Sequence, residues 1–252
     1  MTERRPSVIV HPSAELTAEG AASRLIVRLV ERQSLVSPLH LSLTGGGLGT
    51  AMWSYVARHP LREAVDWSSV HLWWSDERFL PAGDPNRNDT AVLPIAAALG
   101  VPATQRHSVP GPDRTASVEV AADDYAAELG RWAVGDTLPA PRFDISLLGI
   151  GDDGHIASLF PGHEAAARTD ALVVAEPASP KPPAQRVTFT RVLLRQCHTL
   201  WILAAGVAKS PAVSRSLAGD DPANTPASRL VDHPFWLVDA ELAAALDSTP
   251  AS

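Results

Sequence analysis

Short runs of β-branched and aliphatic residues alternate along the chain with longer segments in which apolar residues recur at helical spacing. This alternation is typical of parallel strands that are connected by helices. It predicts strands at residues 8–10, 40–43, 70–74, 143–150, 187–190, 200–204 and 235–238. The expected fold is therefore α/β, with a mainly parallel central sheet flanked by helices.

Helices are expected at residues 16–32, 48–58 and 117–132, after Asn88, and near Val207 and Ala240. The first of these is amphipathic, and the residues expected on its apolar face are Leu25, Ile26, Leu29 and Val30. The stretch 177–183 contains four prolines, which disrupt both helices and strands. It predicts an exposed loop or lid that can border a site.

The 252 residues, of which 45% are hydrophobic, can form a sizeable core. No internal repeat divides the chain. One domain covering residues 1–252 is expected, with disorder only at residues 248–252.

The formal net charge of −7 argues against nucleic-acid binding, which usually needs a basic face. No apolar run of about 18 residues predicts a membrane span, and the start of the chain lacks the apolar stretch of a secretory signal. A cytoplasmic location is therefore expected.

Cys197 is the only cysteine, which excludes an intrachain disulfide and a cysteine-based zinc site, and its apolar neighbours indicate a core residue. Lysine is rare, with only Lys181 and Lys209 against nineteen arginines, so a lysine at a particular site is slightly more informative.

Four polar clusters follow predicted strands, at residues 44–47, 76–78, 151–155 and 206–209. Open parallel sheets bind ligands at the carboxyl ends of their strands. The four clusters are therefore candidates for one common site.

The first cluster is Thr44, Gly45, Gly46 and Gly47, and it places three glycines between a strand and a helix. Backbone N–H groups there can approach an anion at the helix N-terminus, with phosphate as the obvious candidate. A tight strand-to-helix connection explains the same glycines without any ligand.

In the second cluster, Asp76, Glu77 and Arg78 follow an almost wholly apolar strand. Arg78 suits a phosphate or a carboxylate, because its planar guanidinium donates paired hydrogen bonds. The alternative is an internal salt bridge between Arg78 and one of the two acidic residues.

The third cluster contains His155, which is expected at the N-terminus of a helix capped by Asp152 or Asp153. The positive end of a helix disfavours imidazolium, so a neutral ring that accepts a proton is expected, and a neighbouring carboxylate can orient the other ring nitrogen. Three alternatives stay open: a capping or packed histidine, a metal site with the two aspartates, and activation of Ser158 as a nucleophile. Ser158 lacks the Gly-x-Ser-x-Gly pattern of a nucleophile elbow.

The fourth cluster places Lys209 in the first turn after Gly206, within reach of a phosphate shared with the glycine turn. Arg186, which opens the run 186–190, is a further candidate cation. A solvated helix lysine and an edge-strand arginine are the corresponding alternatives.

The segment 149–162, GIGDDGHIASLFPG, resembles the 6-phosphogluconolactonase family, within the wider group that includes glucosamine-6-phosphate deaminase. It matches the lactonase pattern Gly-x-Gly-x-Asp-Gly-His-x-Ala-Ser-Leu-Phe-Pro-Gly at each defined position, and the resemblance extends in order over nearly the whole chain. Related deaminases usually continue with a different run after the histidine and have tyrosine at the third position of the 76–78 cluster. Both differences favour the lactonase branch. The resemblance implies a modified Rossmann-like three-layer fold.

The resemblance also implies that His155 is the base that activates water, with Asp153 beside it. The implied substrate-binding residues are Thr44, Gly45, Gly46, Gly47, Asp76, Arg78, Asn88, Arg186 and Lys209. The chain departs from the family at two places. The usual Ser-Gly-Gly-Ser-Thr-Pro turn reads TGGGLG at residues 44–49 and lacks the second serine hydroxyl, and Arg87 stands where the family often has serine. Arg87 is included among the substrate-binding residues because its charge can compensate for the missing hydroxyl.

The implied activity is hydrolysis of 6-phospho-D-glucono-1,5-lactone to 6-phosphogluconate in the oxidative pentose phosphate pathway, without metal or organic cofactor. The expected partner is this small-molecule substrate, with no nucleic acid and no membrane, and the expected assembly is a monomer or weak homodimer. Two rival hypotheses are an isomerase or deaminase that uses Asp76 to move a C2 proton, and a non-catalytic sugar-phosphate sensor.

Overall fold

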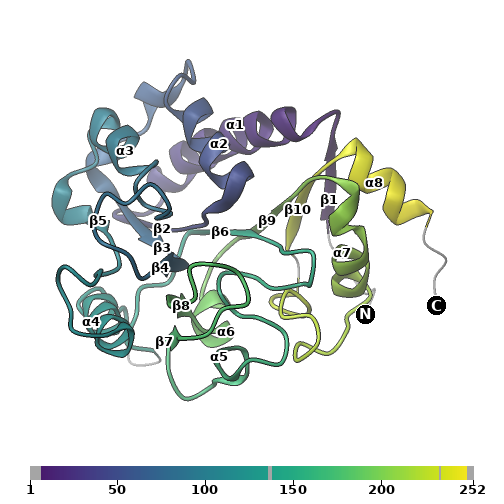
Figure 1. Cartoon of the computed structure of the whole chain (residues 1–252). Helices are drawn as coiled ribbons and strands as arrows, with labels where there is room; N and C mark the ends of the chain where they lie inside the picture. Colours follow the sequence, from purple (N-terminus) through teal and green to yellow (C-terminus); the bar gives the residue numbers. More distant parts are fainter. Residues whose placement is uncertain (1–6, 136–137, 233, 249–252) are drawn as a thin grey trace.

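A seven-stranded parallel sheet forms the centre of the molecule (Figure 1). The structure is a computed structural model that describes residues 7–135, 138–232 and 234–248. From one edge of the sheet to the other, the strands are β1 (Ser7–His11), β10 (Phe235–Asp239), β9 (Leu200–Ala204), β6 (Ile145–Gly149), β2 (Leu39–Leu43), β3 (Val70–Trp74) and β5 (Arg106–His107). Three short strands form a separate antiparallel sheet in the order β4 (Asp76–Arg78), β8 (Arg186–Phe189) and β7 (Val173–Glu176).

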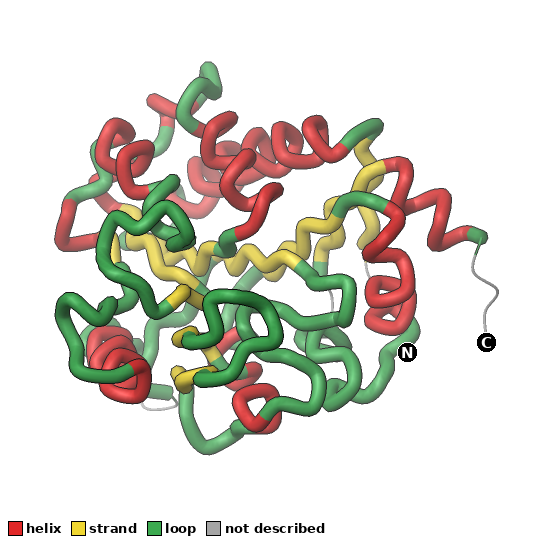
Figure 2. The backbone as a smooth tube through the Cα atoms, viewed as in Figure 1, coloured by secondary structure: helices red, strands yellow, loops and turns green. Residues whose placement is uncertain are grey.

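Helices and the small sheet cover the two faces of the central sheet (Figures 1 and 2). On one face lie α1 (Ala14–Gln33), α2 (Gly46–Val56) and α3 (Leu93–Leu99). The remaining helices are α4 (Val118–Gly130), α5 (Glu164–Ala167), α6 (Arg191–Leu194), α7 (Ser210–Leu217) and α8 (Ala240–Asp247). Short 3₁₀ turns occur at Arg62–Ala64, Trp67–Ser69, Ala103–Gln105 and Val207–Lys209. The predicted three-layer α/β fold with a mainly parallel sheet is confirmed.

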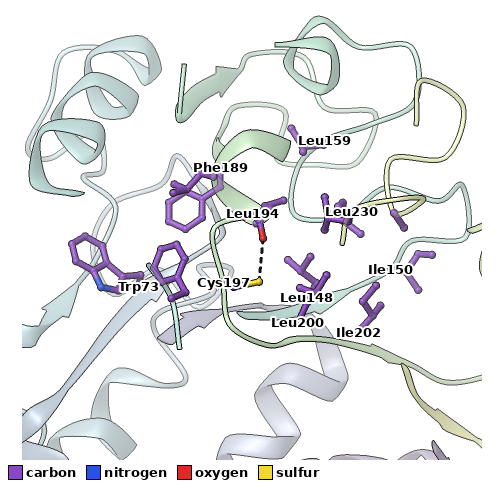
Figure 3. Close-up of a cluster of buried hydrophobic side chains, with 14 of the residues drawn as sticks. Trp73, Leu148, Ile150, Leu159, Phe189, Leu194, Cys197, Leu200, Ile202 and Leu230 are labelled. Carbon is purple, nitrogen blue, oxygen red and sulfur yellow. Dashed lines mark hydrogen bonds between the residues drawn. The ribbon is translucent and has the colours of Figure 1, made fainter. Parts of the chain in front are cut away.

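The central strands are buried on both sides, as expected for parallel strands that carry helices on both faces. On the face opposite α1 and α2, Leu148, Leu200 and Ile202 of the sheet pack with Leu159 and Leu194 in one apolar cluster (Figure 3). Full burial of each such side chain stabilises the fold by roughly 1.5–3 kcal/mol.

Cys197 belongs to the same cluster, and its Sγ lies 3.6 Å from the carbonyl oxygen of Leu194 (Figure 3). Burial raises the pKa of this thiol to about 12, so it stays protonated at neutral pH. The expectation of a core cysteine is confirmed.

The first helix begins where the sequence provides an N-cap, since the Ser13 hydroxyl accepts a hydrogen bond from the Leu16 N–H at 3.2 Å. Leu25, Ile26 and Leu29 are fully buried, as predicted. Val30 was assigned to the same face wrongly. It is 38% exposed, because it lies at the edge of the buried stripe.

Several predicted boundaries were wrong. The strand expected at 143–150 is only Ile145–Gly149, and the one expected at 187–190 is Arg186–Phe189. The 76–78 cluster forms a strand, and β5, β7 and α6 were not predicted. These elements have two to four residues, too few for a hydrophobic period to be visible. Ser248 is the C-cap of α8 and donates a hydrogen bond to the Ala244 carbonyl; the rest of the expected tail, residues 249–252, lies outside the described residues.

The order of the strands places a crevice between β2 and β6. Within the central sheet, the strand that follows β2 in the sequence is β3, on one side, and the strand that follows β6 is β9, on the other. The segments that leave these two strands therefore diverge onto opposite faces, which is the usual position of a ligand site in an open parallel sheet.

Among the described residues, no helix has the length and the apolar composition to cross a membrane.

Three buried histidines stack across the other half of the sheet. His40, His71 and His107 come from the adjacent strands β2, β3 and β5, with ring centroids 4.7 Å apart for the first pair and 5.2 Å apart for the second. His71 Nδ1 and His107 Nε2 are 2.9 Å apart. Burial lowers the pKa of His40 and His71 to about 4 and that of His107 to about 3.

This cluster predicts a loss of stability in mild acid. Between about pH 4 and pH 6.5 the unfolded histidines bind protons that the folded ones do not, so the free energy of unfolding falls as the pH falls. The slope approaches about 1.4 kcal/mol per pH unit for each histidine. Urea unfolding at pH 7.5 and pH 5 measures it. His71→Gln should reduce the slope and His59→Gln, outside the cluster, should not; equal stability at both pH values would contradict the prediction.

Candidate active site

A cleft of about 390 Å³ opens at the carboxyl edge of the sheet, where β2 and β6 diverge. Its walls come from the glycine turn after β2, from β4, from the loop after β6, from the proline-rich segment and from the start of α7. The polar side chains that line it are Thr44, Asp76, Arg78, Asn88, His155, Lys181, Arg186 and Lys209. The structure thus brings together all four clusters that follow the strands.

The glycine turn forms one wall of the cleft. Thr44 Oγ1 accepts a hydrogen bond from the Gly149 N–H at 3.1 Å, which joins the ends of β2 and β6. The N-cap of α2 is Gly45, which has no side chain to satisfy the first N–H groups of the helix. A Cβ atom at Gly45 would lie 1.8 Å from Asn88 Oδ1, so this position requires glycine. The turn therefore presents a positive helix end to the cleft.

Two arginines from the small sheet face each other across the opposite wall. Arg78 of β4 pairs in register with Arg186 of β8. Two like charges in this arrangement repel each other unless an anion lies between them. Arg78 donates a hydrogen bond to Asn88 Oδ1, and its Nε is buried without a partner among the described residues.

Arg186 also holds the proline-rich segment. It is 6% exposed, its Nη2 donates to the Lys181 carbonyl at 2.9 Å, and its Nε donates to the Pro183 carbonyl at 3.2 Å. Burial lowers the pKa of its guanidinium, an effect that the nearby Asp76 carboxylate opposes. Lys181 and Pro182 line the cleft, as expected for a loop that borders a site.

The helix expected at His155 is absent, and that prediction was wrong. The segment after β6 forms a series of turns, because Ala157 has a φ of 49°, which a right-handed helix does not allow, and the next helix starts at Glu164. His155 is held by a carboxylate instead. Its Nδ1 lies 2.6 Å from Asp153 Oδ1, which also accepts the His155 backbone N–H at 3.1 Å.

The contact between Asp153 and His155 determines which ring nitrogen of His155 carries the proton. Burial alone would raise the pKa of Asp153, but the hydrogen bonds and charge of His155 hold it well below its usual value. Since this ionised carboxylate accepts the proton of Nδ1, Nε2 is the basic nitrogen. Nε2 has no hydrogen-bond partner among the described residues, and the ring lines the cleft. A Cβ atom at Gly151 would lie 2.0 Å from Nδ1, so glycine leaves room for the ring.

Lys209 lies at the start of α7, and its Nζ contacts the Ile150 carbonyl and, at 3.5 Å, Asp152 Oδ1. Lys181 was not predicted as a site residue. The available signal was that it is one of only two lysines and lies within the proline-rich segment. No group of three or more His, Cys, Asp or Glu side chains in the described ranges is arranged to hold a metal ion.

Asp76 lies in the cleft, and its Oδ2 accepts the hydroxyl proton of Ser158 at 2.7 Å. Ser158 itself is fully buried. This geometry does not support Ser158 as a nucleophile that His155 activates, because the hydroxyl already donates to Asp76 and does not reach the cleft.

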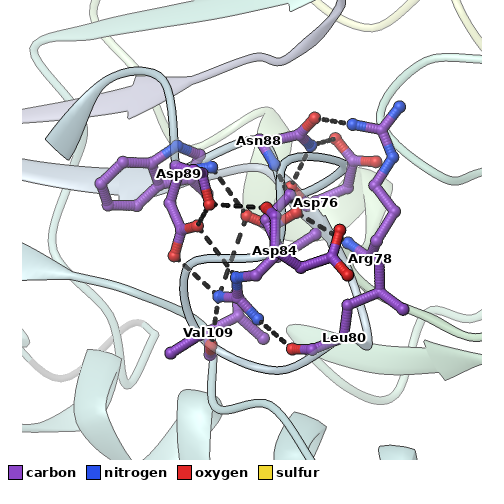
Figure 4. Close-up of polar contacts among 12 residues, drawn as sticks. Asp76, Arg78, Leu80, Asp84, Asn88, Asp89 and Val109 are labelled. Atoms are coloured by element: carbon purple, nitrogen blue, oxygen red, sulfur yellow. Dashed lines mark hydrogen bonds and ion pairs between the residues drawn. The ribbon is translucent and has the colours of Figure 1, made fainter.

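Arg87 is the predicted binding residue that the structure does not bring to the cleft. Only 4% of the residue is exposed, and its guanidinium forms two hydrogen bonds with the Asp89 carboxylate, at 2.9 and 2.7 Å (Figure 4). The guanidinium is enclosed among Leu80, Asp89 and Val109, so the structure does not place its charge in the cleft.

Comparison with known proteins identifies the family of this chain. A family model described as glucosamine-6-phosphate isomerases/6-phosphogluconolactonase matches residues 12–236. The 6-phosphogluconolactonase of Streptomyces coelicolor is 39% identical over 247 residues, covering 96% of this chain and 95% of that protein. The 6-phosphogluconolactonase of Mycobacterium tuberculosis is 34% identical over 248 residues, covering 96% and 99%.

Solved structures show the same fold. The 6-phosphogluconolactonase of Trypanosoma brucei superposes with a TM-score of 0.79 at 25% identity, covering 96% of this chain and 99% of that one. A monomeric glucosamine-6-phosphate deaminase superposes with a TM-score of 0.75 at 23% identity, covering 95% and 99%. The resemblance seen in the sequence is confirmed, and the chain belongs to the glucosamine-6-phosphate isomerase/6-phosphogluconolactonase family.

Proposed function

We propose that this protein hydrolyses 6-phospho-D-glucono-1,5-lactone to 6-phospho-D-gluconate, with water activated by His155. The observation that carries the proposal is the Nε2 of His155, which has no hydrogen-bond partner in the described part of the chain and lies in a cleft lined by cations, with Nδ1 held by Asp153. The relatives named 6-phosphogluconolactonase, which match over nearly their whole length, support the choice of substrate.

The chemistry needs one base that also serves as the acid. Nε2 of His155 takes a proton from water as the water oxygen attacks the C1 carbonyl, and the carbonyl oxygen becomes an oxyanion. Backbone N–H groups and cations around the cleft stabilise this charge. When the tetrahedral intermediate collapses, the bond from C1 to the ring oxygen breaks, and His155 returns the proton to that oxygen. Asp153 stabilises the imidazolium between the two transfers.

The rest of the cleft suits a phosphorylated sugar. Four cations, Arg78, Lys181, Arg186 and Lys209, line one cleft of a protein whose net charge is −7. Together with the N-terminus of α2 they form a strongly anion-attracting surface. Asp76 and Asn88 supply a carboxylate and an amide for sugar hydroxyls. We assign the cations and the glycine turn to the phosphate, which anchors the lactone beside His155.

The proposal includes the setting of the reaction. The protein acts in the cytoplasm, in the oxidative pentose phosphate pathway, as a monomer or weak homodimer. Its partner is the small-molecule substrate, with no nucleic acid and no membrane, and the reaction uses no metal or organic cofactor.

Replacing His155 with alanine should lower kcat roughly 10²- to 10⁴-fold, because the general base is lost. Release of 6-phosphogluconate from freshly generated lactone, corrected for spontaneous hydrolysis, measures the rate. Binding of 6-phosphogluconate should persist, and His163→Ala should keep near-normal turnover, since His163 is not among the lining residues. Undiminished turnover in the His155 variant refutes the assigned role, and ammonia release from glucosamine 6-phosphate by the wild type would favour a deaminase.

Replacing Lys209 with methionine should raise KM for the phosphorylated lactone by about tenfold while changing kcat less, because a charge-assisted contact with the phosphate is lost. The same variant should act like wild type on D-glucono-1,5-lactone, which has no phosphate. Arg131→Met is the matched control, since Arg131 is exposed and lies outside the cleft. An equal loss with both lactones would contradict a role in phosphate binding.

A further inference from the structure

Glu77, Arg87 and Asp89 form a buried charge cluster (Figure 4). It adjoins the cleft, because its chain neighbours Arg78 and Asn88 are lining residues. We infer that Arg87, through Asp89 and Glu77, is a positioning residue that fixes Asn88 and Arg78 for capture of the phosphorylated substrate. This inference rests on the proposed function. It assigns Arg87 an indirect role in place of contact with the substrate.

Arg87 contacts four residues, two through their carboxylates and two through their backbone carbonyls. Beyond its two bonds to Asp89, Nη1 donates to the Leu80 carbonyl at 2.9 Å and Nη2 donates to the Val109 carbonyl at 2.8 Å. Nη2 also lies 3.9 Å from Glu77 Oε2. The guanidinium thereby ties the loop between β4 and α3 to the segment after β5.

Glu77 is the second centre of the cluster, and its carboxylate accepts hydrogen bonds from three backbone N–H groups. It is fully buried, and its Oε1 accepts the N–H groups of Arg78 at 2.8 Å and Asn88 at 2.7 Å, while Oε2 accepts that of Asp89 at 2.9 Å. Burial and the neighbouring Asp89 carboxylate raise the pKa of Glu77, whereas Arg87 lowers it. Loss of Arg87 leaves two buried carboxylates without a cation, so Glu77 takes up a proton and accepts these N–H groups less strongly.

The backbone held in this way belongs to residues that reach the cleft. Asn88 Nδ2 donates to the Asp76 carbonyl at 2.8 Å, and Asn88 Oδ1 accepts from Arg78. The same Oδ1 lies so close to the glycine turn that no Cβ atom fits at Gly45. A shift of Asn88 therefore moves both a cleft cation and the contact with the N-terminus of α2.

The catalytic pair is held mainly by contacts on its own loop, which is linked to the cluster only indirectly, through Ser158 and Asp76. Asp153 and His155 lie on the loop after β6 and are fixed by each other. None of the hydrogen bonds of Arg87 within the described residues reaches that loop. Loss of Arg87 should therefore affect substrate capture more than the proton transfers.

The decisive experiment compares Arg87→Met with Arg32→Met. Arg32 is also a largely buried arginine that bonds to an aspartate, Asp144, with contacts of 2.6 and 3.1 Å, but it lies outside the cleft and its supports. Both variants should lose thermal stability. Only Arg87→Met should raise KM for the phosphorylated lactone, by roughly tenfold or more, as for the misplacement of a charge-assisted hydrogen bond, with a smaller change in kcat. Arg87→Lys, which keeps the charge and lowers the risk of unfolding, should recover part of KM.

A KM that is unchanged in Arg87→Met, or equally raised in Arg32→Met, overturns the inference and leaves Arg87 a purely structural residue. Calorimetric titration with 6-phosphogluconate separates this outcome from a failure of the proposed function. A wild-type protein that binds 6-phosphogluconate without hydrolysing the lactone refutes the function, while at least tenfold weaker binding by Arg87→Met alone still supports positioning. Equal binding by all the variants overturns it.

Discussion

The parallel pairing of β2 with β6 determines where the cleft of this protein lies. The two strands are joined by their ladder and, at their carboxyl ends, by the hydrogen bond from the Gly149 N–H to Thr44 Oγ1. Beyond that bond the chain leaves in opposite directions, and the cleft occupies the space between. The glycine turn and the loop of His155 are thus neighbours in space, although about a hundred residues separate them in the sequence.

Electrostatics then gives the cleft its chemical character. An acidic chain gathers four cations and an uncapped helix N-terminus on one small surface, and two of those cations, Arg78 and Arg186, face each other across paired strands. Such an arrangement is unfavourable without an anion, so it favours the binding of one. His155 differs from these cations, because its Nδ1 is held by the Asp153 carboxylate at 2.6 Å.

The small antiparallel sheet connects the cleft to the core. It presents Asp76, Arg78 and Arg186 to the cleft, while the side chain between the first two, Glu77, points away and accepts three backbone N–H groups. The alternation of side chains along a strand explains why neighbouring residues have such different roles. Arg87 balances the charge of this interior carboxylate, so the support of the cleft is itself an ion cluster.

The sequence alone was sufficient for the fold class, for most strands of the central sheet and for the family, because long apolar periods and the segment 149–162 are local signals. It also identified His155, Asp76, Arg78 and Lys209 in the clusters that follow strands, and Arg186 as a cation that opens a strand, and the cleft contains all five. Tertiary structure decided what local patterns cannot encode. Glycines and aspartates before His155 resemble a helix start, yet Ala157 and the buried residues that follow form turns. The sequence does not distinguish an arginine that contacts a phosphate from one that contacts a buried carboxylate. Only the packing of Asp89 and Glu77 around Arg87 shows that its surroundings differ from those of Arg78.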